Sequence, residues 1–416
     1  MKCSHLVLWM VAGSCATAAL AQPDTSRPPD GGAAQRDPIA ALLALERYPL
    51  VALREDLGEA LVDKEKEVEL VRDSIAAASE VVQSRAKDII GRGDHGKALG
   101  CYAAKFTVSG ADAVRPEHQA GVARADNLGK TFDAIVRLSN SEPRDVSDFR
   151  SATVGLAVKV MLDPARPAQD EFLLERSGAQ DFVAGGLDKF VSPSISTYAD
   201  LFRRRIHPVT NALQIIDQHP DAYWVFFKEP LLRFVNPSPG AAPIVLETTF
   251  SSLVPYAWGN EAVKFRFKPC REYDRRVAKF SRFDSDYQSK VVAQELESNA
   301  ICYVMEIQPR PRAGSDDERA AIDKAYPLDD ATVRWPEAGT AQGAPGSEFR
   351  EVARVTIEQG SKAMDEQSCE CLAFNPWNGL KAHQPLGSLN RARLAVYKQS
   401  ELARMDKYRP PCPHDK

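Results

Sequence analysis

The sequence predicts an α+β protein whose core is an antiparallel β-barrel with surrounding helices. From Gly91 onward, short apolar segments rich in β-branched and aromatic residues recur, separated by Gly, Pro and Asp turns. Seven or more strands of that length argue for an antiparallel sheet or barrel. Helical candidates lie between and after the strands. The strand candidates are 99–109, 132–141, 152–162, 244–255, 262–269, 301–309 and 350–358.

Helical material also precedes the strands. Residues 38–90 form a helical N-terminal arm, with apolar residues mostly three and four apart among many charges, and we assign this arm a packing role. A lead-in at 22–37, rich in Pro, Gly and Asp, is expected to be flexible. The main domain follows at 91–408. Its helical candidates are 194–206, 210–218, 285–297 and 389–404.

Residues 1–21 have the layout of a secretory signal peptide. Lys2 precedes an apolar run over 6–12, and small residues end at an Ala19-Leu20-Ala21 cleavage site. The run is too short to span a bilayer, and no later stretch is long and apolar enough, so we expect no transmembrane segment in the mature chain. The predicted location is periplasmic or secreted. Cys15 as a lipoprotein attachment site is the alternative.

Charge and cysteine content give further information about binding partners and disulfide bonds. A formal net charge of −4 without a long basic run gives no electrostatic reason to expect nucleic acid. Six cysteines remain after the predicted signal, an even number that allows up to three disulfides in an exported chain. Their pairing stays open, although Cys369 and Cys371 are too close in sequence to bond to each other without strain. The six are Cys101, Cys270, Cys302, Cys369, Cys371 and Cys412.

The helical candidate at 389–404 carries a tyrosine between two arginines. A helix advances about 100° per residue, so Arg393, Tyr397 and Arg404 lie within roughly 40° of one another on one face. Neighbouring positive charge stabilises the charged form of an acid and favours Tyr397 as phenolate. Tyrosinate is one of the few axial haem ligands that proteins use. The alternative is an aromatic residue at a core edge beside a solvated arginine.

Two further segments carry polar residues in unusual places. His95 lies in a Gly-rich turn that leads into a strand, where it can point into a cavity; the alternative is a turn histidine bonded to backbone. In the strand candidate 132–141, alternation places Arg137 and Ser139 on one face with Ile135. If that face is enclosed, the arginine needs an anionic partner such as a haem propionate. The alternative is an outward, solvated face.

These segments together resemble the haem catalase superfamily, in its divergent, shorter catalase-like branch. The resemblance covers about residues 88–405 in the family's order. The matches are 92–97 (RGDHGK) to R-x-x-H-A-K-G, 136–139 (VRLS) to V-R-F-S, 155–159 (GLAVK) to G-x-A-V-K, and Arg393, Tyr397 and Arg404 to the proximal helix. Segments 256–264 (YAWGNEAVK), 374–378 (FNPWN) and 384–387 (QPLG) also resemble that branch.

The resemblance implies that 91–408 is a catalase-like, haem b-binding domain. Tyr397 would be the axial ligand of the haem iron, with Arg393 holding it as phenolate. His95 would be the distal base that moves a proton between the peroxide oxygens, and Ser139 would hold its imidazole. An anionic axial ligand favours cleavage of the O–O bond.

The resemblance also implies contacts to the rest of the haem. Arg92, Arg137 and Arg404 would meet the propionates, and Tyr198 would take the place of an aromatic residue stacked on the haem. The implied function is decomposition of hydrogen peroxide or organic peroxides, as a catalase or a peroxidase.

One departure from the family's pattern concerns the distal side. Where typical catalases carry an asparagine that orients peroxide, this chain has Gly185 and Gly186. Peroxidase turnover, or turnover of a bulkier organic hydroperoxide, therefore stands beside dismutation of hydrogen peroxide. Two alternatives stay open: a fatty-acid hydroperoxide isomerase or lyase on the same fold, and a non-catalytic periplasmic haem-binding protein.

Overall fold

The computed structural model of this chain describes most of the region between residues 53 and 407. The described residues are 53–60, 66–74, 76, 92, 95–141, 146–148, 153–162, 172–173, 178–206, 244–274, 284–337 and 345–407. Only the backbone is described for residues 202–206 and 402–407. The predicted signal peptide, the lead-in at 22–37 and the helical candidate at 210–218 lie outside these residues.

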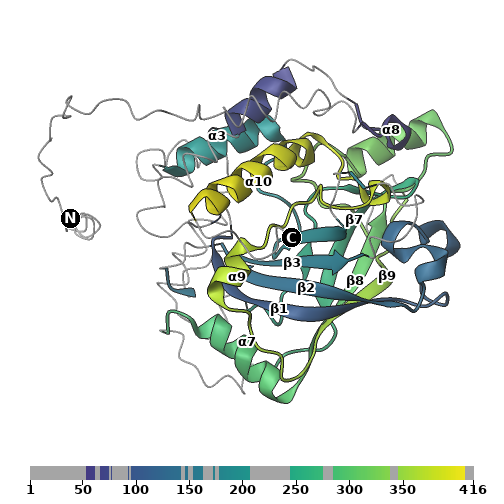
Figure 1. The fold of residues 1–416 in the computed structure, drawn as a ribbon. Helices are drawn as coiled ribbons and strands as arrows, with labels where there is room; N and C mark the ends of the chain where they lie inside the picture. The colour runs from purple at the N-terminus through teal and green to yellow at the C-terminus, as the bar shows by residue number, and fades with distance from the viewer. Residues whose placement is uncertain are drawn as a thin grey trace, which may run out of the picture.

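The described residues form an antiparallel β-barrel with helices around it, as predicted (Figure 1). Within them, nine strands form one sheet in the order β5-β4-β3-β2-β1-β9-β8-β7-β6. Pairing of β5 with β7 closes eight strands into the barrel, and the short strand β6 extends the sheet by pairing with β7. The strands are β1 (Lys97–Val108), β2 (Thr131–Asn140), β3 (Val154–Met161), β4 (Ala179–Gly185), β5 (Phe250–Ser251), β6 (Tyr256–Trp258), β7 (Glu261–Pro269), β8 (Ile301–Pro309) and β9 (Arg350–Ile357).

Alternation along the strands separates a packed interior from an outer face. Val136, Leu138 and Phe182 point into the interior, where Phe182 contacts the rings of Phe265 and Phe267 edge to face. Buried aromatic pairs of this geometry add to the stabilisation that burial itself gives. Six of the predicted strands are confirmed as β1, β2, β3, β7, β8 and β9.

The remaining strands differ from the prediction. The prediction at 244–255 is wrong in extent, because only Phe250–Ser251 form a strand there and 245–247 form a turn. The sequence does not predict β4 or β6. β4 reads AQDFVAG, in which polar and glycine residues interrupt the apolar pattern, and β6 has only three residues.

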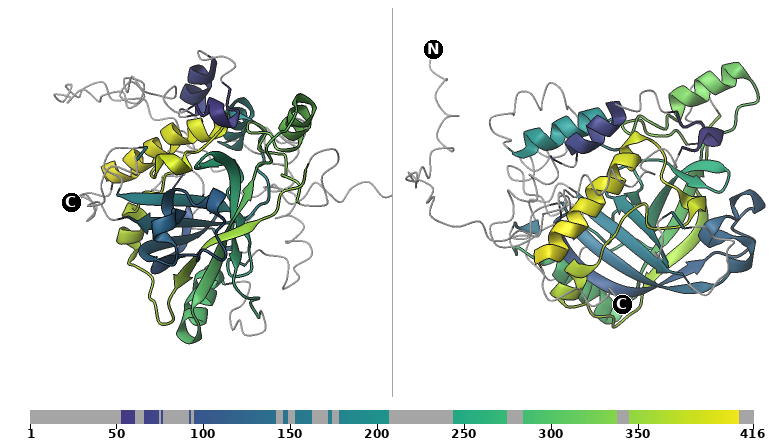
Figure 2. Two further views of the ribbon diagram at one scale, coloured as in Figure 1. Left: turned by 90° about the vertical axis from the view of Figure 1, so that its right-hand side faces the viewer. Right: turned by 45° about the horizontal axis from the view of Figure 1, so that its top comes forward.

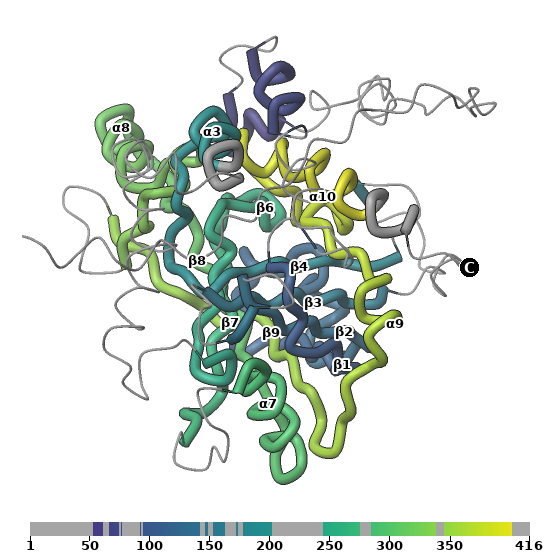
Figure 3. Tube along the Cα trace, turned by 90° about the vertical axis from the view of Figure 1, so that its left-hand side faces the viewer, coloured from purple at the N-terminus to yellow at the C-terminus, as the bar shows by residue number. Residues whose placement is uncertain are grey.

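Helices cover the barrel at both sides. The predicted helices at 194–206, 285–297 and 389–404 are confirmed as α3 (Ile195–Ile206), α7 (Tyr287–Ser298) and α10 (Ser388–Lys407). α10 lies over the side of the barrel formed by β3 and β4, and α7 lies on the opposite side (Figures 1 and 3). The other helices are α8 (Asp316–Ala325) and α9 (Glu366–Cys371), with 3-10 turns η2 (Glu55–Leu57), η3 (Pro116–His118), η4 (Gly121–Ala123), η5 (Ala125–Asn127) and η9 (Lys381–His383).

Helix α8 was not among the predicted helices, although its start carries a recognisable signal. The side chain of Ser315 accepts a hydrogen bond from the backbone N–H of Glu318, as in a capping box. No helix among the described residues is long and apolar enough to cross a membrane.

Two disulfides, whose pairing the sequence left open, join cysteines that both lie in the described residues. Cys101 of β1 bonds to Cys369 of α9, and Cys270 bonds to Cys302 at the start of β8. Cys371 is also disulfide-bonded, and Cys369 and Cys371 are not bonded to each other, as expected from their spacing. The first bond joins residues 268 positions apart and fixes α9 to the outer face of β1.

The described part of the N-terminal arm packs against α10. Residues 66–74 are helical, and Val71 shares a small apolar core with Ile195 of α3 and Ala392 of α10 (Figure 2). This contact agrees with the packing role assigned to the arm. Because α10 carries Arg393 and Tyr397, this contact helps to position two residues of the candidate site.

A buried ion-pair network makes the same connection. Arg391 of α10 is 2% exposed, and it donates hydrogen bonds to Glu59 at 2.7 Å and to both oxygens of Glu67 at 2.5 and 3.1 Å. Glu59 also accepts from the backbone N–H of Gly387 at 2.6 Å, just before the helix begins. These carboxylates fix the N-terminal end of α10.

Replacing Arg391 with Met is expected to lower the free energy of unfolding by about 3–5 kcal/mol, because two buried carboxylates lose their cation. Urea unfolding of the disulfide-intact protein measures this loss. The matched control is Arg319→Met on α8, whose exposed arginine lies 4.0 Å from Asp316; its change should stay within about 0.5 kcal/mol. Equal unfolding midpoints for the wild type and Arg391→Met would contradict this role.

Candidate active site

The Arg393–Tyr397 pair on α10 is joined by a hydrogen bond. Arg393 Nη2 donates to Tyr397 Oη at 3.0 Å, and the guanidinium carbon lies 5.1 Å from the centroid of the Tyr397 ring. Arg393 Nη1 donates to Tyr256 Oη at 3.2 Å and to the side-chain oxygen of Asn390 at 3.0 Å. Arg393 therefore donates hydrogen bonds to two phenol oxygens, those of Tyr256 and Tyr397.

The two phenols differ in their surroundings. Burial by itself lowers the pKa of Arg393, but the Tyr256 and Tyr397 phenols raise it, and the net pKa lies above the usual arginine value. Burial raises the pKa of Tyr256, and Arg393 offsets only part of that shift. Tyr256 is 3% exposed in the barrel core, whereas Tyr397 is half-buried. Tyr397 is thus the more accessible of the two.

Asn390 connects α10 to the segments beside it. Its backbone carbonyl accepts a hydrogen bond from Trp377 Nε1 at 2.6 Å, and its side-chain NH2 donates to the Pro255 carbonyl at 2.8 Å. Trp377 belongs to the FNPWN segment at 374–378, and Pro255 directly precedes β6. Both contacts lie within one turn of Arg393 and hold its part of the helix in place.

Asp181 anchors the FNPWN segment to the barrel. This fully buried carboxylate on β4 accepts from the backbone N–H of Asn375 at 2.9 Å, from the Asn378 amide at 3.1 Å and from Lys159 Nζ at 2.6 Å. Burial raises the pKa of Asp181, and Lys159 opposes that shift. Such a carboxylate is tolerated in the interior because each oxygen has a donor.

The outer face of β2 is polar but buried. Val136 and Leu138 point into the barrel, while Arg137 and Ser139 point outward and are only 4% and 3% exposed. The predicted alternation is therefore correct. The outward face is not solvated, because α9 and the segment after it cover the neighbouring outer surface; Leu372 packs there against Cys101 and Ala157.

Two arginines lie near one carboxylate beside the outer face of β2. Arg137 Nη2 lies 3.8 Å and Arg92 Nε 3.7 Å from the carboxylate of Glu370, which is 6% exposed on α9. Arg137 also donates to the His95 carbonyl at 3.1 Å, and Arg92 donates to the Leu372 carbonyl at 2.7 Å. Burial lowers the pKa of Arg137 to about 9, the Arg92 charge contributes, and Glu370 opposes the shift.

His95 lies against the outer face of β3. Its backbone has a φ of +51°, a value that is uncommon for non-glycine residues and costs conformational energy. A Cβ atom on Gly155 would lie 2.7 Å from His95 Nδ1 and 2.9 Å from Ser139 Oγ. The imidazole and the hydroxyl therefore meet over Gly155, and any larger residue there would displace them. Ser139 Oγ also lies 3.3 Å from the Gly155 carbonyl.

Gly185 and Gly186 continue this surface. Gly185 of β4 pairs with Gly155 of β3 on one side and with Ser251 of β5 on the other, and Ser139 pairs with Gly155. Four small residues therefore form one row across four strands on the outer face. Gly186 is packed tightly, since a Cβ there would meet other atoms at 2.9–3.2 Å.

Tyr198 and Arg404 complete the residues predicted from the sequence. Tyr198 of α3 is half-buried, its ring centroid lies 5.5 Å from that of Phe190, and it is near enough to Arg393 to raise the pKa of that arginine. It therefore lies on the α10 side of the site. Arg404 falls within α10, but its side chain lies outside the described residues.

The structure thus places the predicted residues in two groups. Arg393, Tyr397 and Tyr198 lie on α10 and α3, whereas Arg92, His95, Arg137 and Ser139 gather at the outer face of the barrel. α9 contacts both β1 and α10 and so joins the two groups. Figure 3 shows α10 and α9 on the same side of the strands.

Three residues that shape these groups are not predicted as site residues from the sequence. Tyr256 lies in the YAWGNEAVK segment and Asn390 in the last helix, and neither carries a local signal of its contact with Arg393. Glu370 lies between two disulfide-bonded cysteines, and no periodic pattern marks it as a partner for arginines more than 200 residues upstream. Such pairings arise from the tertiary fold alone.

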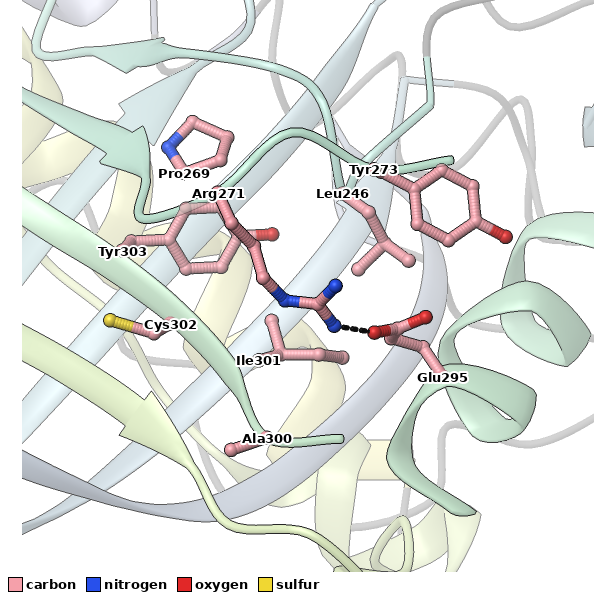
Figure 4. A pocket seen from close by; sticks show the side chains of 9 residues that line it. All are labelled: Leu246, Pro269, Arg271, Tyr273, Glu295, Ala300, Ile301, Cys302 and Tyr303. Carbon is pink, nitrogen blue, oxygen red and sulfur yellow. Dashed lines mark hydrogen bonds and ion pairs between the residues drawn. The ribbon is translucent and has the colours of Figure 1, made fainter. Parts of the chain in front are cut away.

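A separate hollow lies beside α7, and no residue of either group lines it (Figure 4). An ion pair between Arg271 and Glu295 crosses it, and Tyr303 lies on its other wall. It contains no residue predicted to act in catalysis. No group of three or more His, Cys, Asp and Glu side chains in the described part of the chain is arranged to hold a metal ion.

Comparison with known proteins gives a likeness of fold. No protein-family model and no curated protein sequence matches the chain. A fungal catalase matches with a TM-score of 0.53 and 17% identity, over 77% of this chain and 60% of that one. Catalase A from Saccharomyces cerevisiae gives 0.52 and 18%, over 77% and 62%. A bacterial catalase gives 0.54 and 15%, over 85% and 63%.

These matches confirm the predicted catalase-like fold. At 15–18% identity they show the fold alone, and the chain spans about 60–63% of the length of those catalases. The residues of the two groups described above must therefore carry any statement about chemistry.

Proposed function

We propose that this chain binds haem b through Tyr397 and decomposes hydrogen peroxide or organic peroxides, as a catalase or a peroxidase. The observation that carries the proposal is the hydrogen bond from Arg393 to the accessible phenol oxygen of Tyr397. The likeness of fold to three catalases supports it. The grouping of His95 and Ser139 over a glycine on the outer face of the barrel supports it as well.

The described residues fit a haem group in two respects. Arg137 Nε is buried and has no hydrogen-bond partner among the described residues, and Glu370 lies beyond hydrogen-bond distance of the two arginines it serves. The Arg92–Arg137 pair therefore suits an anionic propionate, which would also relieve the repulsion between the two cations. The absence of a side chain at Gly155 lets the His95 imidazole and the Ser139 hydroxyl lie directly against the outer face, where the distal base of a haem site would be needed.

On the helix side, Tyr397 would hold the iron through its phenol oxygen. The cation of Arg393, held in place by Tyr256 and Asn390, would stabilise the negative charge of that oxygen. When bound, the haem would supply the redox equivalents, and the anionic phenol oxygen of Tyr397 would favour breaking the O–O bond.

On the barrel side, His95 would move one proton. Its imidazole would take the proton from one oxygen of a bound peroxide and return it to the other, which is general acid–base work. Ser139 lies at the same glycine and would orient the ring. Arg137 donates to the His95 carbonyl and so holds the strained backbone of that residue.

Oxygen evolution from hydrogen peroxide by the haem-loaded mature protein, measured beside oxidation of a phenolic reductant, tests the proposal. Oxygen release supports catalase activity, and peroxide-dependent oxidation of the phenol supports peroxidase activity. Conversion of a lipid hydroperoxide without any reductant would instead favour an isomerase or lyase. Haem uptake without turnover of any peroxide would leave only a haem-binding role.

We also propose that the protein is exported. Disulfides persist in oxidising compartments, and the described residues contain the Cys101–Cys369 and Cys270–Cys302 bonds. N-terminal sequencing of the protein from the periplasm or medium should begin at Gln22. An intact N-terminus in the cytosolic fraction would contradict export, and lipid attached to Cys15 would identify a lipoprotein instead.

A further inference from the structure

The candidate site has a second strained residue, Leu253. Among the described residues, only His95 and Leu253 combine a side chain with a positive φ, at +51° and +65°. For a leucine this conformation costs on the order of 1–3 kcal/mol, and it persists only where the surroundings enforce it. Residues strained in this way cluster at functional sites.

The two strained residues lie over paired positions of the same sheet. Leu253 Cδ1 would be 3.1 Å from a Cβ on Gly185, and His95 Nδ1 would be 2.7 Å from a Cβ on Gly155. Gly155 and Gly185 are directly paired on neighbouring antiparallel strands, where Cα atoms are about 4.5–5.5 Å apart. The leucine side chain and the imidazole are therefore neighbours on the outer face.

The segment that carries Leu253 is held from both sides. On the barrel side, the backbone N–H of Ser252 donates to the Phe265 carbonyl at 2.8 Å, and its hydroxyl donates to the Val254 carbonyl at 2.9 Å. On the helix side, the Pro255 carbonyl accepts from Asn390 of α10 at 2.8 Å. Leu253 is thus held in a fixed position between α10 and the row of small residues at 139, 155, 185 and 251.

The leucine and the glycine beside it fit each other. A side chain at position 185 would crowd Leu253, so Leu253 takes the space that the absence of a side chain at Gly185 leaves. Leu253 is itself only half-buried. The His95 imidazole therefore has a partly accessible apolar side chain as its neighbour, and there is no amide donor at position 185 to orient a small polar molecule such as hydrogen peroxide.

We propose that Leu253 determines the substrate specificity of this site, and that the substrate is an alkyl hydroperoxide whose hydrocarbon group contacts Leu253 while its peroxide group lies at His95. This inference rests on the proposed peroxide-decomposing function. In peroxidase turnover the O–O bond of ROOH breaks. Two molecules of a phenolic reductant each give up one electron and one proton, and the products are ROH, water and two phenoxyl radicals.

The test compares kcat/KM for cumene hydroperoxide and hydrogen peroxide in the haem-loaded full chain, with guaiacol as the phenolic reductant. The wild type should prefer cumene hydroperoxide by about 10-fold or more, as apolar contacts allow. Leu253→Asn should lower that ratio by at least about 10-fold, because an amide replaces the apolar contact. Asparagine tolerates a positive φ better than most residues, so this variant should fold.

Two controls isolate the apolar contact. Leu253→Met keeps an apolar side chain of similar volume, and its ratio should stay near the wild-type value. Leu128→Asn alters another half-buried leucine, next to the turn that joins the far ends of β1 and β2, and it should leave the ratio unchanged. Haem content, measured by absorbance, should match the wild type in all three variants.

A binding measurement gives a readout that does not depend on turnover. Calorimetric titration with 2-phenyl-2-propanol, the alcohol product, should show binding about 10-fold weaker in Leu253→Asn than in the wild type or Leu253→Met. An unchanged ratio and unchanged alcohol binding in Leu253→Asn would overturn the role of Leu253 alone. If the haem-loaded wild type turned over neither peroxide, the proposed function would fail with it.

Discussion

Replacing Tyr397 with Phe is expected to abolish normal haem binding. The phenylalanine keeps the aromatic ring on α10 and removes only the oxygen that accepts from Arg393 at 3.0 Å, so the variant loses the iron ligand while it keeps the packing. Titration of the purified variant with ferric haem, followed by absorption spectroscopy, measures the effect. A wild-type spectrum in Tyr397→Phe would remove this residue from the ligand role.

The structure supplies a matched control for that experiment. Tyr256 Oη accepts from the same arginine at 3.2 Å, but its side chain is buried in the barrel core. Tyr256→Phe should therefore retain the haem spectrum, with at most a shift in the stability of the complex because Arg393 loses one partner. Loss of the spectrum in Tyr256→Phe, with retention in Tyr397→Phe, would assign the ligand to Tyr256 instead.

Replacing His95 with Ala is expected to reduce peroxide turnover by about 10²–10⁴-fold, the range for removal of a general acid–base group. Haem binding should be retained, because the imidazole lies over Gly155 on the barrel side and not on α10. Initial rates of peroxide consumption at equal haem content measure the loss. The variant also relieves little of the backbone strain, since alanine is no better suited to a positive φ.

Ser139→Ala is the companion variant for the His95 measurement. Because Ser139 meets the imidazole without reaching the substrate in the proposed arrangement, its loss should reduce turnover less than loss of His95 does. Unchanged turnover in His95→Ala would exclude this residue as the base. A larger effect of Ser139→Ala than of His95→Ala would point to a different role for the serine.

Much of the fold follows from the sequence because the barrel strands are locally marked. Six strands each contain β-branched and aromatic residues that favour a strand whatever the surrounding structure. They are β1, β2, β3, β7, β8 and β9. β4 is not marked in this way, because Asp181 and Gly185 interrupt its pattern. Asp181 is tolerated in a buried strand only through Lys159, Asn375 and Asn378, two of which lie almost 200 residues later.

Individual pairs of residues in the candidate site can be predicted from the sequence, but the way in which these pairs come together in the fold cannot. The spacing of Arg393 and Tyr397 predicts their contact, because a helix brings residues four apart together. Alternation along β2 places Arg137 and Ser139 on one face, but it does not say what covers that face. Glu370, Leu253 and Tyr256 enter the site through loops and long-range pairings that leave no periodic signal.

The absorption spectrum of the haem-loaded protein reports directly on whether Tyr397 ligates the iron. The mature wild-type chain, titrated with ferric haem, should bind one haem per chain and show the spectrum of a high-spin, tyrosinate-ligated ferric haem. A low-spin, histidine-ligated spectrum, or no saturable binding, would contradict ligation by Tyr397.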